Sequence, residues 1–352
     1  MRKFHLILML ALLAFIFAMN SALASPPNQD SWGETYIVQA DDWLSKIADK
    51  FYGDAFMYPA IVEATTIKAM SDDTFTVIDN PNLIHVGQKL WVPTQSVAEQ
   101  IMSAGNILDR GDVTTFKYFI HPDVGVYEFR VRWNSDGSAN SIEIYDAQIQ
   151  TSVQPINFAA DVFYDRNIRA PDAFLEAADY NFDGYTDFRH VAEIGGRGVY
   201  NTHMIWLFDA QTNRFVLDET LSSLRSVRPV PKKKELVSHI WDPTSEAFLI
   251  YQYREQSPVL VRDVEKCLLA EKYCTDFLDK AAGGDASGLI EQARQSRGDG
   301  QDFGALVVSQ PDADAACLSI FVPDERTGWW STIGEQVVIQ GNEAQCRAAE
   351  EY

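Results

Sequence analysis

The most distinctive chemistry in this chain lies in the stretch DYNFDGYTD, which runs from Asp179 to Asp187. Side-chain oxygen donors occupy its first, third, fifth and ninth positions, and a glycine occupies the sixth, where a tight loop must turn sharply. Hard oxygen ligands that alternate along a short loop are typical of calcium sites, in which the seventh residue adds a backbone carbonyl. The sequence therefore predicts that calcium is bound by Asp179, Asn181, Asp183, the carbonyl of Tyr185, and Asp187.

This loop differs from an EF-hand in its second half. The twelfth position is His190, where an EF-hand has a bidentate glutamate, and the residues after Asp187 alternate like a strand. Carboxylates this close in sequence repel one another, and a bound dication would turn that repulsion into coordination. The alternative is an Asx-turn hairpin that is held by bonds from side chains to the backbone and needs no metal.

The sequence around the loop extends the pattern. Residues 127–264 resemble a proteobacterial family of periplasmic, calcium-binding, β-propeller-like proteins related to lysozyme inhibitors, some of which act as immunity proteins; the specific part is Ala178 to Val216. The resemblance implies calcium binding by the loop and a neighbouring loop that blocks a lysozyme-type active site. That neighbour lacks the serine that often opens the family's motif, and the alternative is a flexible hairpin connection. The candidate inhibitory residues are Gly195, Gly196, Arg197, Gly198 and Tyr200.

The first residues have the pattern of a secretory signal. Arg2 and Lys3 precede an apolar run from Leu6 to Phe17, and small residues follow at Ala22 to Ala24. Residues 1–24 are therefore predicted to be a signal peptide, and the mature protein is expected in the periplasm or, alternatively, outside the cell. No membrane span is expected after the signal is removed, because no later segment is apolar enough. A retained N-terminal anchor is the alternative.

The next block, residues 32–94, predicts the order strand, helix, helix, strand. Tyr36 and Val38 alternate as in a strand, and the apolar residues from Leu44 to Phe51 fall at helical spacing, with Gly53 just past the end. A second helix is expected at about residues 57–70, and a short strand at about 89–92.

This block resembles a LysM domain, in the variant whose second helix is followed by an extended loop. It departs from the family at Asp41, where glycine is usual, and at Thr66, where asparagine is common. The matching positions are Tyr36, Val38, Asp42, Leu44, Ile47, Ala48, Gly53, Asn82, Leu83, Ile84, Gly87, Gln88, Leu90 and Pro93.

The resemblance implies binding to polymers that contain N-acetylglucosamine, which in a bacterial periplasm means peptidoglycan. Two loops on one side can form a shallow groove whose amides pair with an N-acetyl group and whose apolar surface seats its methyl. The alternative is a degenerate module kept for packing or protein contacts. The expected glycan-binding residues are Asp41, Asp42, Trp43, Leu44, Asn82, Leu83 and Ile84.

The rest of the chain divides into three parts. Residues 95–122 are expected to be a linker with an entry strand, and residues 123–264 an antiparallel β domain of sandwich or propeller-like type, because alternating runs are separated by hairpin signals. Residues 265–352 are expected to be a small α+β tail that opens with a helical run from Cys267. The predicted fold class is therefore multidomain and mainly β, with α+β parts.

All four cysteines lie in this last part, at Cys267, Cys274, Cys317 and Cys346. An even number in an exported chain predicts two disulfides. Three pairings are possible, and joining the nearest neighbours gives Cys267 with Cys274 and Cys317 with Cys346. A zinc site is the weaker alternative, because no C-x-x-C motif or nearby histidine pair accompanies them.

The formal charge of −21 becomes −23 when Arg2 and Lys3 are removed with the signal. So acidic a protein is a poor partner for nucleic acid, whereas a basic protein or a divalent cation suits it. The run PKKK, from Pro231 to Lys234, is expected to be the solvated end of a hairpin.

No catalytic motif stands out, because no histidines are paired as in a zinc helix and no G-x-S-x-G is present. The sequence favours a non-enzymatic, peptidoglycan-associated periplasmic protein whose calcium-stabilised β domain inhibits a basic lysozyme-like glycosidase. One alternative is a wall-bound scaffold that binds another envelope protein without inhibiting it. A second alternative is a cell-wall hydrolase whose activity lies in residues 265–352.

Overall fold

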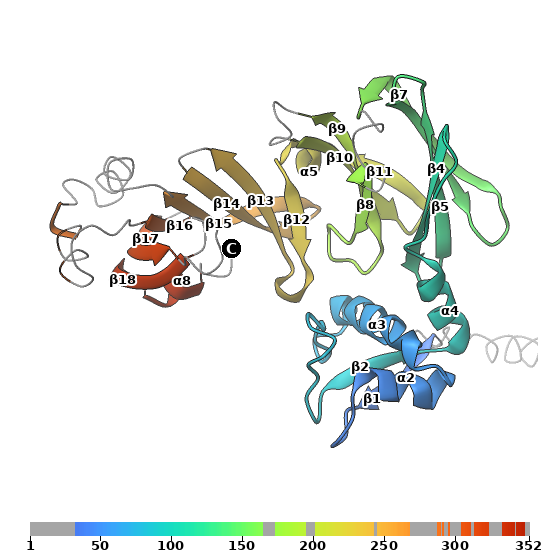
Figure 1. Cartoon of the computed structure of the whole chain (residues 1–352), viewed down its shortest axis with the longest axis horizontal. Coiled ribbons are helices and arrows are strands. Elements are labelled where there is room, and N and C mark those ends of the chain that lie inside the picture. Colours follow the sequence, from blue (N-terminus) through green and yellow to red (C-terminus); the bar gives the residue numbers. More distant parts are fainter. Residues whose placement is uncertain are drawn as a thin grey trace, which may run out of the picture.

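A computed structural model of the chain shows several antiparallel sheets and a few helices (Figure 1). The prediction of a mainly β chain with α+β parts is therefore confirmed for the fold class. None of the helices in the described part of the chain is long and apolar enough to cross a membrane. The structure describes residues 32–164, 173–194, 201–242, 245–267, 304–310, 313–323, 333–341 and 343–348, together with a few positions between 287 and 295.

The N-terminal module has the predicted βααβ order. Strands β1 and β2 pair antiparallel, with Tyr36 opposite Leu90, and the two helices pack on them. The second helix and the last strand are connected by a long loop, residues 72–88. The elements of the module are β1 (Gly33–Ile37), α2 (Leu44–Tyr52), the short 3-10 turn η1 (Ala55–Met57), α3 (Tyr58–Ser71) and β2 (Lys89–Pro93).

Helix α2 follows the signals read from its sequence. Leu44, Ile47 and Ala48 are buried on one face, as their spacing predicts. Gly53 ends the helix with a φ of 69°, in the left-handed region that glycine adopts without strain, and its N–H donates to the carbonyl of Asp49.

Residues 95–122, which were expected to be a linker with one strand, hold a helix and two strands. Helix α4 (Gln95–Ser103) starts at Thr94, whose side chain accepts from the Val97 N–H at 3.5 Å. The helix forms because its apolar residues find partners on both sides: Ile101 lies in one buried cluster with Trp91 of β2 and Phe119 of β4. Strands β3 (Ile107–Asp109) and β4 (Val113–His121) follow.

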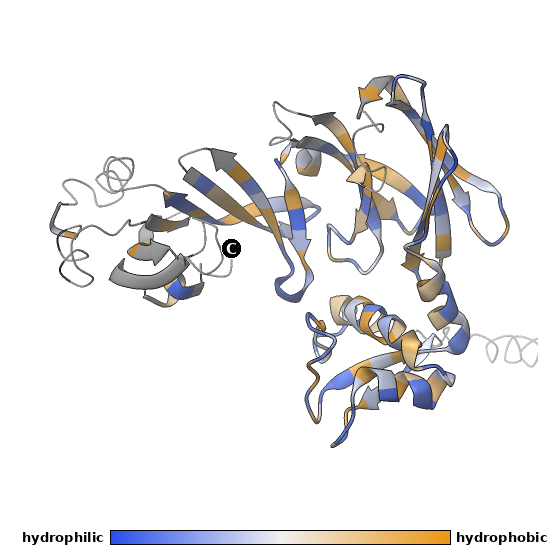
Figure 2. Cartoon of the chain, in the orientation of Figure 1, coloured by the Kyte–Doolittle hydropathy of each residue, from blue (hydrophilic) through white to orange (hydrophobic). Residues whose placement is uncertain are grey.

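The β domain begins with two antiparallel sheets. The five-stranded sheet has the order β3-β4-β5-β6-β7, and hydrophobic and hydrophilic residues alternate along its strands (Figure 2). The four-stranded sheet has the order β11-β10-β9-β8. The remaining strands are β5 (Gly125–Trp133), β6 (Ser138–Asp146), β7 (Ser152–Phe163), β8 (Leu175–Ala178), β9 (Asp187–Ile194), β10 (Asn201–Asp209) and β11 (Arg214–Asp218).

These two sheets share one aromatic core. The ring of Phe129 in β5 lies 5.0 Å from that of Phe188 in β9, and Phe188 lies 4.9 Å from Phe215 in β11. Face-to-face burial of two sheets is the arrangement of a sandwich. The described strands do not show the propeller-like form that the prediction also allowed.

The third sheet has seven strands in the order β12 to β18. Strand β15 runs across residue 264, so the sheet joins the end of the expected β domain to the expected tail. Its elements, with the flanking helices, are α5 (Glu219–Ser223), β12 (Val227–Val230), the 3-10 turn η4 (Pro231–Lys233), β13 (Glu235–Asp242), β14 (Ser245–Arg254), β15 (Ser257–Cys267), β16 (Gly304–Gln310), β17 (Ala313–Pro323), β18 (Ile333–Gly341) and α8 (Glu343–Ala348).

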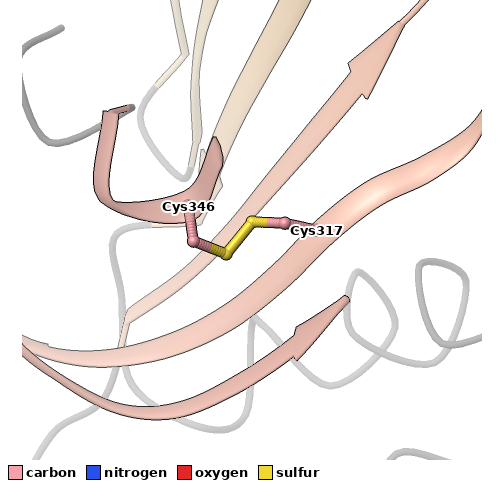
Figure 3. The surroundings of a disulfide bond; sticks show 2 residues. All are labelled: Cys317 and Cys346. Carbon is pink, nitrogen blue, oxygen red and sulfur yellow. A yellow bond between two sulfur atoms is a disulfide. The ribbon is translucent and has the colours of Figure 1, made fainter. Parts of the chain in front are cut away.

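One predicted disulfide is present in this region. Cys317 of β17 and Cys346 of α8 are bonded, with 5.7 Å between their Cα atoms (Figure 3). Cys267 is also disulfide-bonded. Its expected partner, Cys274, lies outside the described residues, as do the expected signal peptide, nearly all of the helical run after Cys267, and the candidate inhibitory loop, residues 195–200.

Candidate functional site

Two loops of the N-terminal module lie beside each other, as the glycan-binding prediction requires. The first, residues 39–44, leads from β1 to α2, and the second is the end of the long loop, residues 80–88. The N–H of Val38 donates to the Gln88 carbonyl at 3.0 Å, and the Gly87 N–H donates to the Val38 carbonyl at 2.9 Å. These backbone bonds hold the start of the first loop against the end of the second.

Asp42 braces the first loop. Its carboxylate accepts from the Tyr36 hydroxyl at 2.7 Å and from the Gln39 N–H at 2.8 Å. Burial alone would raise the pKa of Asp42, but these donors and the charges of Lys46 and Lys50 outweigh it, so the pKa is lowered. Asp42 is therefore an ionised structural group.

The backbone conformation at Asp41 is compatible with aspartate, although glycine is usual at this position of the family pattern. Asp41 has a φ of 63°, in the left-handed region where glycine is strain-free and aspartate is tolerated. The substitution keeps the turn, and the Asp41 carbonyl still accepts a bond from Lys46 Nζ at 2.9 Å.

The next two predicted residues have opposite roles. Leu44 is buried in the core of the module, so it cannot contact a glycan. Trp43, at the start of α2, has 57% of its surface exposed, and the ammonium group of Lys46 lies 5.0 Å from its ring centre. Trp43 thus gives the first loop an exposed aromatic surface.

The second loop offers two exposed apolar side chains. Asn80 forms its turn, since its side chain accepts from the Asn82 N–H at 3.0 Å and its carbonyl accepts from the Leu83 N–H at 2.9 Å. Leu83 is 57% exposed and Val86 is 72% exposed, whereas Ile84 packs partly against the core. Sequence reasoning missed Val86; an apolar residue just before the turning glycine was the available signal.

The acidic loop, residues 179–187, brings its first four predicted residues into one hydrogen-bonded turn. The two oxygens of Asp179 accept from the N–H groups of Asp183, at 3.2 Å, and Gly184, at 2.9 Å. The Asn181 amide donates to Asp183 at 2.9 Å, and Asp183 accepts from the Tyr185 N–H at 2.9 Å. The side chain to backbone bonds of the Asx-turn alternative are therefore present.

Asp187 has a different position from the other three polar residues. It is fully buried at the start of β9, where one carboxylate oxygen accepts from the Phe208 N–H at 2.8 Å and the other from the Tyr180 N–H at 2.7 Å. These bonds tie both ends of the acidic loop to strand β10. Asp187 therefore has a structural role that its place in the sequence pattern did not indicate.

Tyr185 packs the acidic loop against both of the first two sheets of the β domain. Its ring stacks on His121 at 4.2 Å and on Phe208 at 5.4 Å, measured between ring centres. The next residue, Thr186, donates its N–H to the Ile120 carbonyl at 2.9 Å. The loop is thus packed as well as hydrogen-bonded.

Burial and mutual repulsion disfavour the charged forms of these acids. Burial and the nearby charge of Asp183 raise the pKa of Asp179 to about 7. Burial and the charge of Asp179 raise the pKa of Asp187 well above its usual value. The groups that oppose both shifts are backbone N–H donors, so fixed dipoles rather than lysine or arginine charges offset the repulsion.

The donor set determines which metal could be accommodated. Among the described residues, no three His, Cys, Asp or Glu side chains come close enough to hold a metal ion by themselves. A cation in the acidic loop would also need the Asn181 amide oxygen and a backbone carbonyl. Such an all-oxygen set suits calcium and does not suit zinc.

The run PKKK is the exposed end of a hairpin, as its sequence suggested, but two of its lysines also have acidic partners that the sequence did not indicate. It forms the turn between β12 and β13, and Lys232 and Lys234 make ion pairs with Asp79 and Asp73 of the long loop. The partners are more than 150 residues away in sequence. Local sequence could not reveal them.

Comparison with known proteins gives three findings. A protein of Deinococcus radiodurans described only as uncharacterized is 37% identical over 71 residues, which are 20% of this chain and about a quarter, 24%, of that protein. A solved structure titled as a Xanthomonas Type IV Secretion System related protein is 16% identical and covers 46% of this chain and 86% of its own, with a TM-score of 0.34. A TM-score this low does not establish a shared fold.

The third finding agrees with the geometry of the N-terminal module. The family model described as LysM domain matches residues 36–93, which include both helices, both loops, the whole of β2 and the end of β1. LysM domains bind peptidoglycan and related glycans and occur in proteins of the cell envelope. Residues 36–93 of this chain are therefore a LysM domain.

Proposed function

We propose that this protein is a periplasmic peptidoglycan-binding protein, anchored to the wall by its LysM domain. The observation that carries the proposal is the family match over residues 36–93 together with the two tied loops. The signal pattern of residues 1–24 supports a location outside the cytoplasm.

The exposed surface of the loops suits an N-acetylated sugar. Such a ligand needs partners for its amide and an apolar seat for its methyl group. Trp43 of the first loop and Leu83 and Val86 of the second supply exposed apolar surface beside loop backbone. Since these side chains are already exposed, the site binds without a large rearrangement.

The first prediction tests this surface with Leu83→Ala/Val86→Ala. The double variant should bind chitooligosaccharide or insoluble peptidoglycan roughly ten-fold more weakly, because about 1–2 kcal/mol of apolar burial is lost. Isothermal titration or co-sedimentation measures the change. The matched control is Phe56→Ala, which removes a side chain that is 81% exposed but lies between α2 and α3, outside both loops. Equal binding by the double variant and the control would contradict the assigned surface.

Calcium binding by the acidic loop is the second part of the proposal. The support is chemical: burial and the charge of a neighbouring aspartate raise the pKa values of Asp179 and Asp187, and backbone N–H dipoles are the groups that oppose these shifts. A dication among Asp179, Asn181, Asp183 and the Tyr185 carbonyl would supply the missing positive charge. When bound, calcium contributes coordination and rigidity, while Asp187 and the Tyr185 ring hold the loop to the sheets.

The second prediction concerns thermal stability. Millimolar calcium should raise the melting temperature of the chain, and Asp183→Asn should remove most of that rise, because one anionic ligand is lost while the side chain keeps its size. Asp136→Asn is the matched control, since Asp136 caps the turn between β5 and β6 by accepting from the N–H and the hydroxyl of Ser138, and neither bond involves the acidic loop. A calcium response that survives in Asp183→Asn would rule out this loop as the site.

The third prediction is a pH dependence of the same stability. Without calcium, the folded Asp179 keeps its proton up to a pKa of about 7, whereas the unfolded chain releases it near 3.8, so this contribution to stability is lost as pH rises toward and through 7. Calcium replaces that proton, so its stabilising effect should grow over the same range. Melting curves from pH 5 to about pH 8, with calcium and with a chelator, measure both trends. A calcium effect that does not change with pH would contradict the assignment.

Inhibition of a lysozyme-type glycosidase is the third part of the proposal. It is supported by the resemblance of residues 127–264 to lysozyme-inhibitor proteins and by the acidic charge of −21, which would steer a basic enzyme toward the chain. Attachment to peptidoglycan would raise the local concentration of the inhibitor where such an enzyme acts.

The fourth prediction is that the full chain slows peptidoglycan hydrolysis by at least one lysozyme when present at micromolar concentration. Arg197→Ala/Tyr200→Ala should relieve that inhibition and leave peptidoglycan binding unchanged. A turbidity assay over several lysozyme types measures the rate. If every enzyme stays fully active, the β domain is a scaffold for another envelope protein; if the chain alone clears the peptidoglycan, it is a hydrolase.

A further inference from the structure

The long loop of the LysM domain, residues 72–88, has two functional halves. Its first half carries Asp73 and Asp79, and its second half carries the exposed apolar residues Leu83 and Val86. A constraint on the first half therefore limits where the second half can lie.

A hairpin from the third sheet supplies such a constraint. The lysine hairpin, residues 231–234, consists of η4 and Lys234 and joins β12 to β13; its tip points toward the LysM domain (Figure 1). Lys232 Nζ lies 2.8 Å from a carboxylate oxygen of Asp79, and Lys234 Nζ lies 3.1 Å from one of Asp73. The hairpin thus reaches the long loop at two points.

Lys234 also bonds the helix that leads into the long loop. Its Nζ donates to the carbonyl of Met70 at 3.2 Å, and Met70 is in the last turn of α3, which ends at Ser71. Carbonyls in a last turn lack partners within their helix, and a cation there interacts favourably with the helix dipole. The lysine hairpin therefore holds the helix end as well as the loop.

The backbone of the hairpin is consistent with a specific role for this lysine. Lys234 has a φ of 50°, a left-handed conformation that a glycine would adopt without strain. A lysine at this position accepts the strain and gains a side chain that reaches α3. The acidic loop also lies close to this helix end: a Cβ on Gly184 would lie 3.8 Å from the carbonyl oxygen of Ile67 and 3.8 Å from Met70 Cβ.

The ion pairs of the lysine hairpin are too weak to hold a domain together, but they can restrict a loop. Lys232 and Asp79 have side chains that are 57% and 54% exposed, and exposed pairs are individually weak and screened by salt. Two pairs and a helix-end bond from one short turn cannot fold a domain, but they can reduce the freedom of an exposed loop. Reducing that freedom before binding lowers the ordering cost of binding.

We propose that Lys232 and Lys234 are positioning residues for the glycan-binding loop: the lysine hairpin of the third sheet holds residues 72–79 so that residues 80–88 are pre-arranged for the glycan. This inference rests on the proposed glycan binding by the LysM domain. The affinity for peptidoglycan would then depend on the third sheet as well as on the LysM domain, and it would fall as ionic strength rises.

The fifth prediction compares Lys232→Gln/Lys234→Gln with the wild-type chain. At about 0.01 M salt the double variant should bind chitooligosaccharide roughly three- to ten-fold more weakly, and at about 1 M salt the two should converge, since the Debye length falls from about 30 Å to about 3 Å. The matched control is Arg214→Gln/Arg228→Gln, which removes the same charge from exposed positions on β11 and β12. Exchanging the charges of one pair, in Lys232→Asp/Asp79→Lys, should restore part of the affinity that Lys232→Asp alone loses.

Hydrogen exchange gives a readout that does not depend on glycan. The double variant should speed amide exchange in residues 72–88, and the arginine control should not. If wild type and double variant bind equally at low salt, the positioning role is overturned while the proposed glycan binding stands. If the wild type binds no glycan, the proposed function fails; accelerated exchange in the double variant would then still support the positioning role, and unchanged exchange would overturn it.

Discussion

A buried apolar seam joins the LysM domain to the β domain, and the positions of both candidate sites depend on it. Trp91 of β2, Ile101 of α4 and Phe119 of β4 belong to one buried cluster that also includes residues of α3 and β5. Removal of apolar surface from water is the main favourable term available for holding one domain against another. The seam holds α3 in place, and both the acidic loop and the lysine hairpin lie next to Met70 in the last turn of this helix.

The LysM domain could be predicted from the sequence because its signals are local. The spacing of Ile47 and Ala48 gives the face of α2, and Gly53 gives its end. The sequence did not separate Trp43, which is exposed, from Leu44, which is buried, because both are apolar residues at the start of one helix. Helix α4 was not predicted from the sequence. Its apolar face is short, and the residue that buries it, Phe119, comes from the following strand β4.

The acidic loop was predictable in composition but not in all its roles. The alternation of donors correctly indicated that Asp179, Asn181 and Asp183 share one turn. The role of Asp187 could not be read, since its partner Phe208 is 21 residues away on β10 and meets it only when the sheet forms. The lysine hairpin is the extreme case, because its partners precede it by more than 150 residues.

Acidic side chains near the end of α3 are stabilised in two ways, by lysine side chains and by backbone N–H groups. The exposed acids of the long loop face lysine side chains in water, where dissolved ions compete for both partners, so salt weakens these pairs. The acids of the acidic loop accept from backbone N–H groups instead, and the buried Asp187 among them is screened far less by dissolved ions than the exposed pairs are. Salt therefore acts on the lysine pairs at this helix end far more than on the backbone bonds of the buried Asp187, although the lysine hairpin and the acidic loop both lie next to Met70.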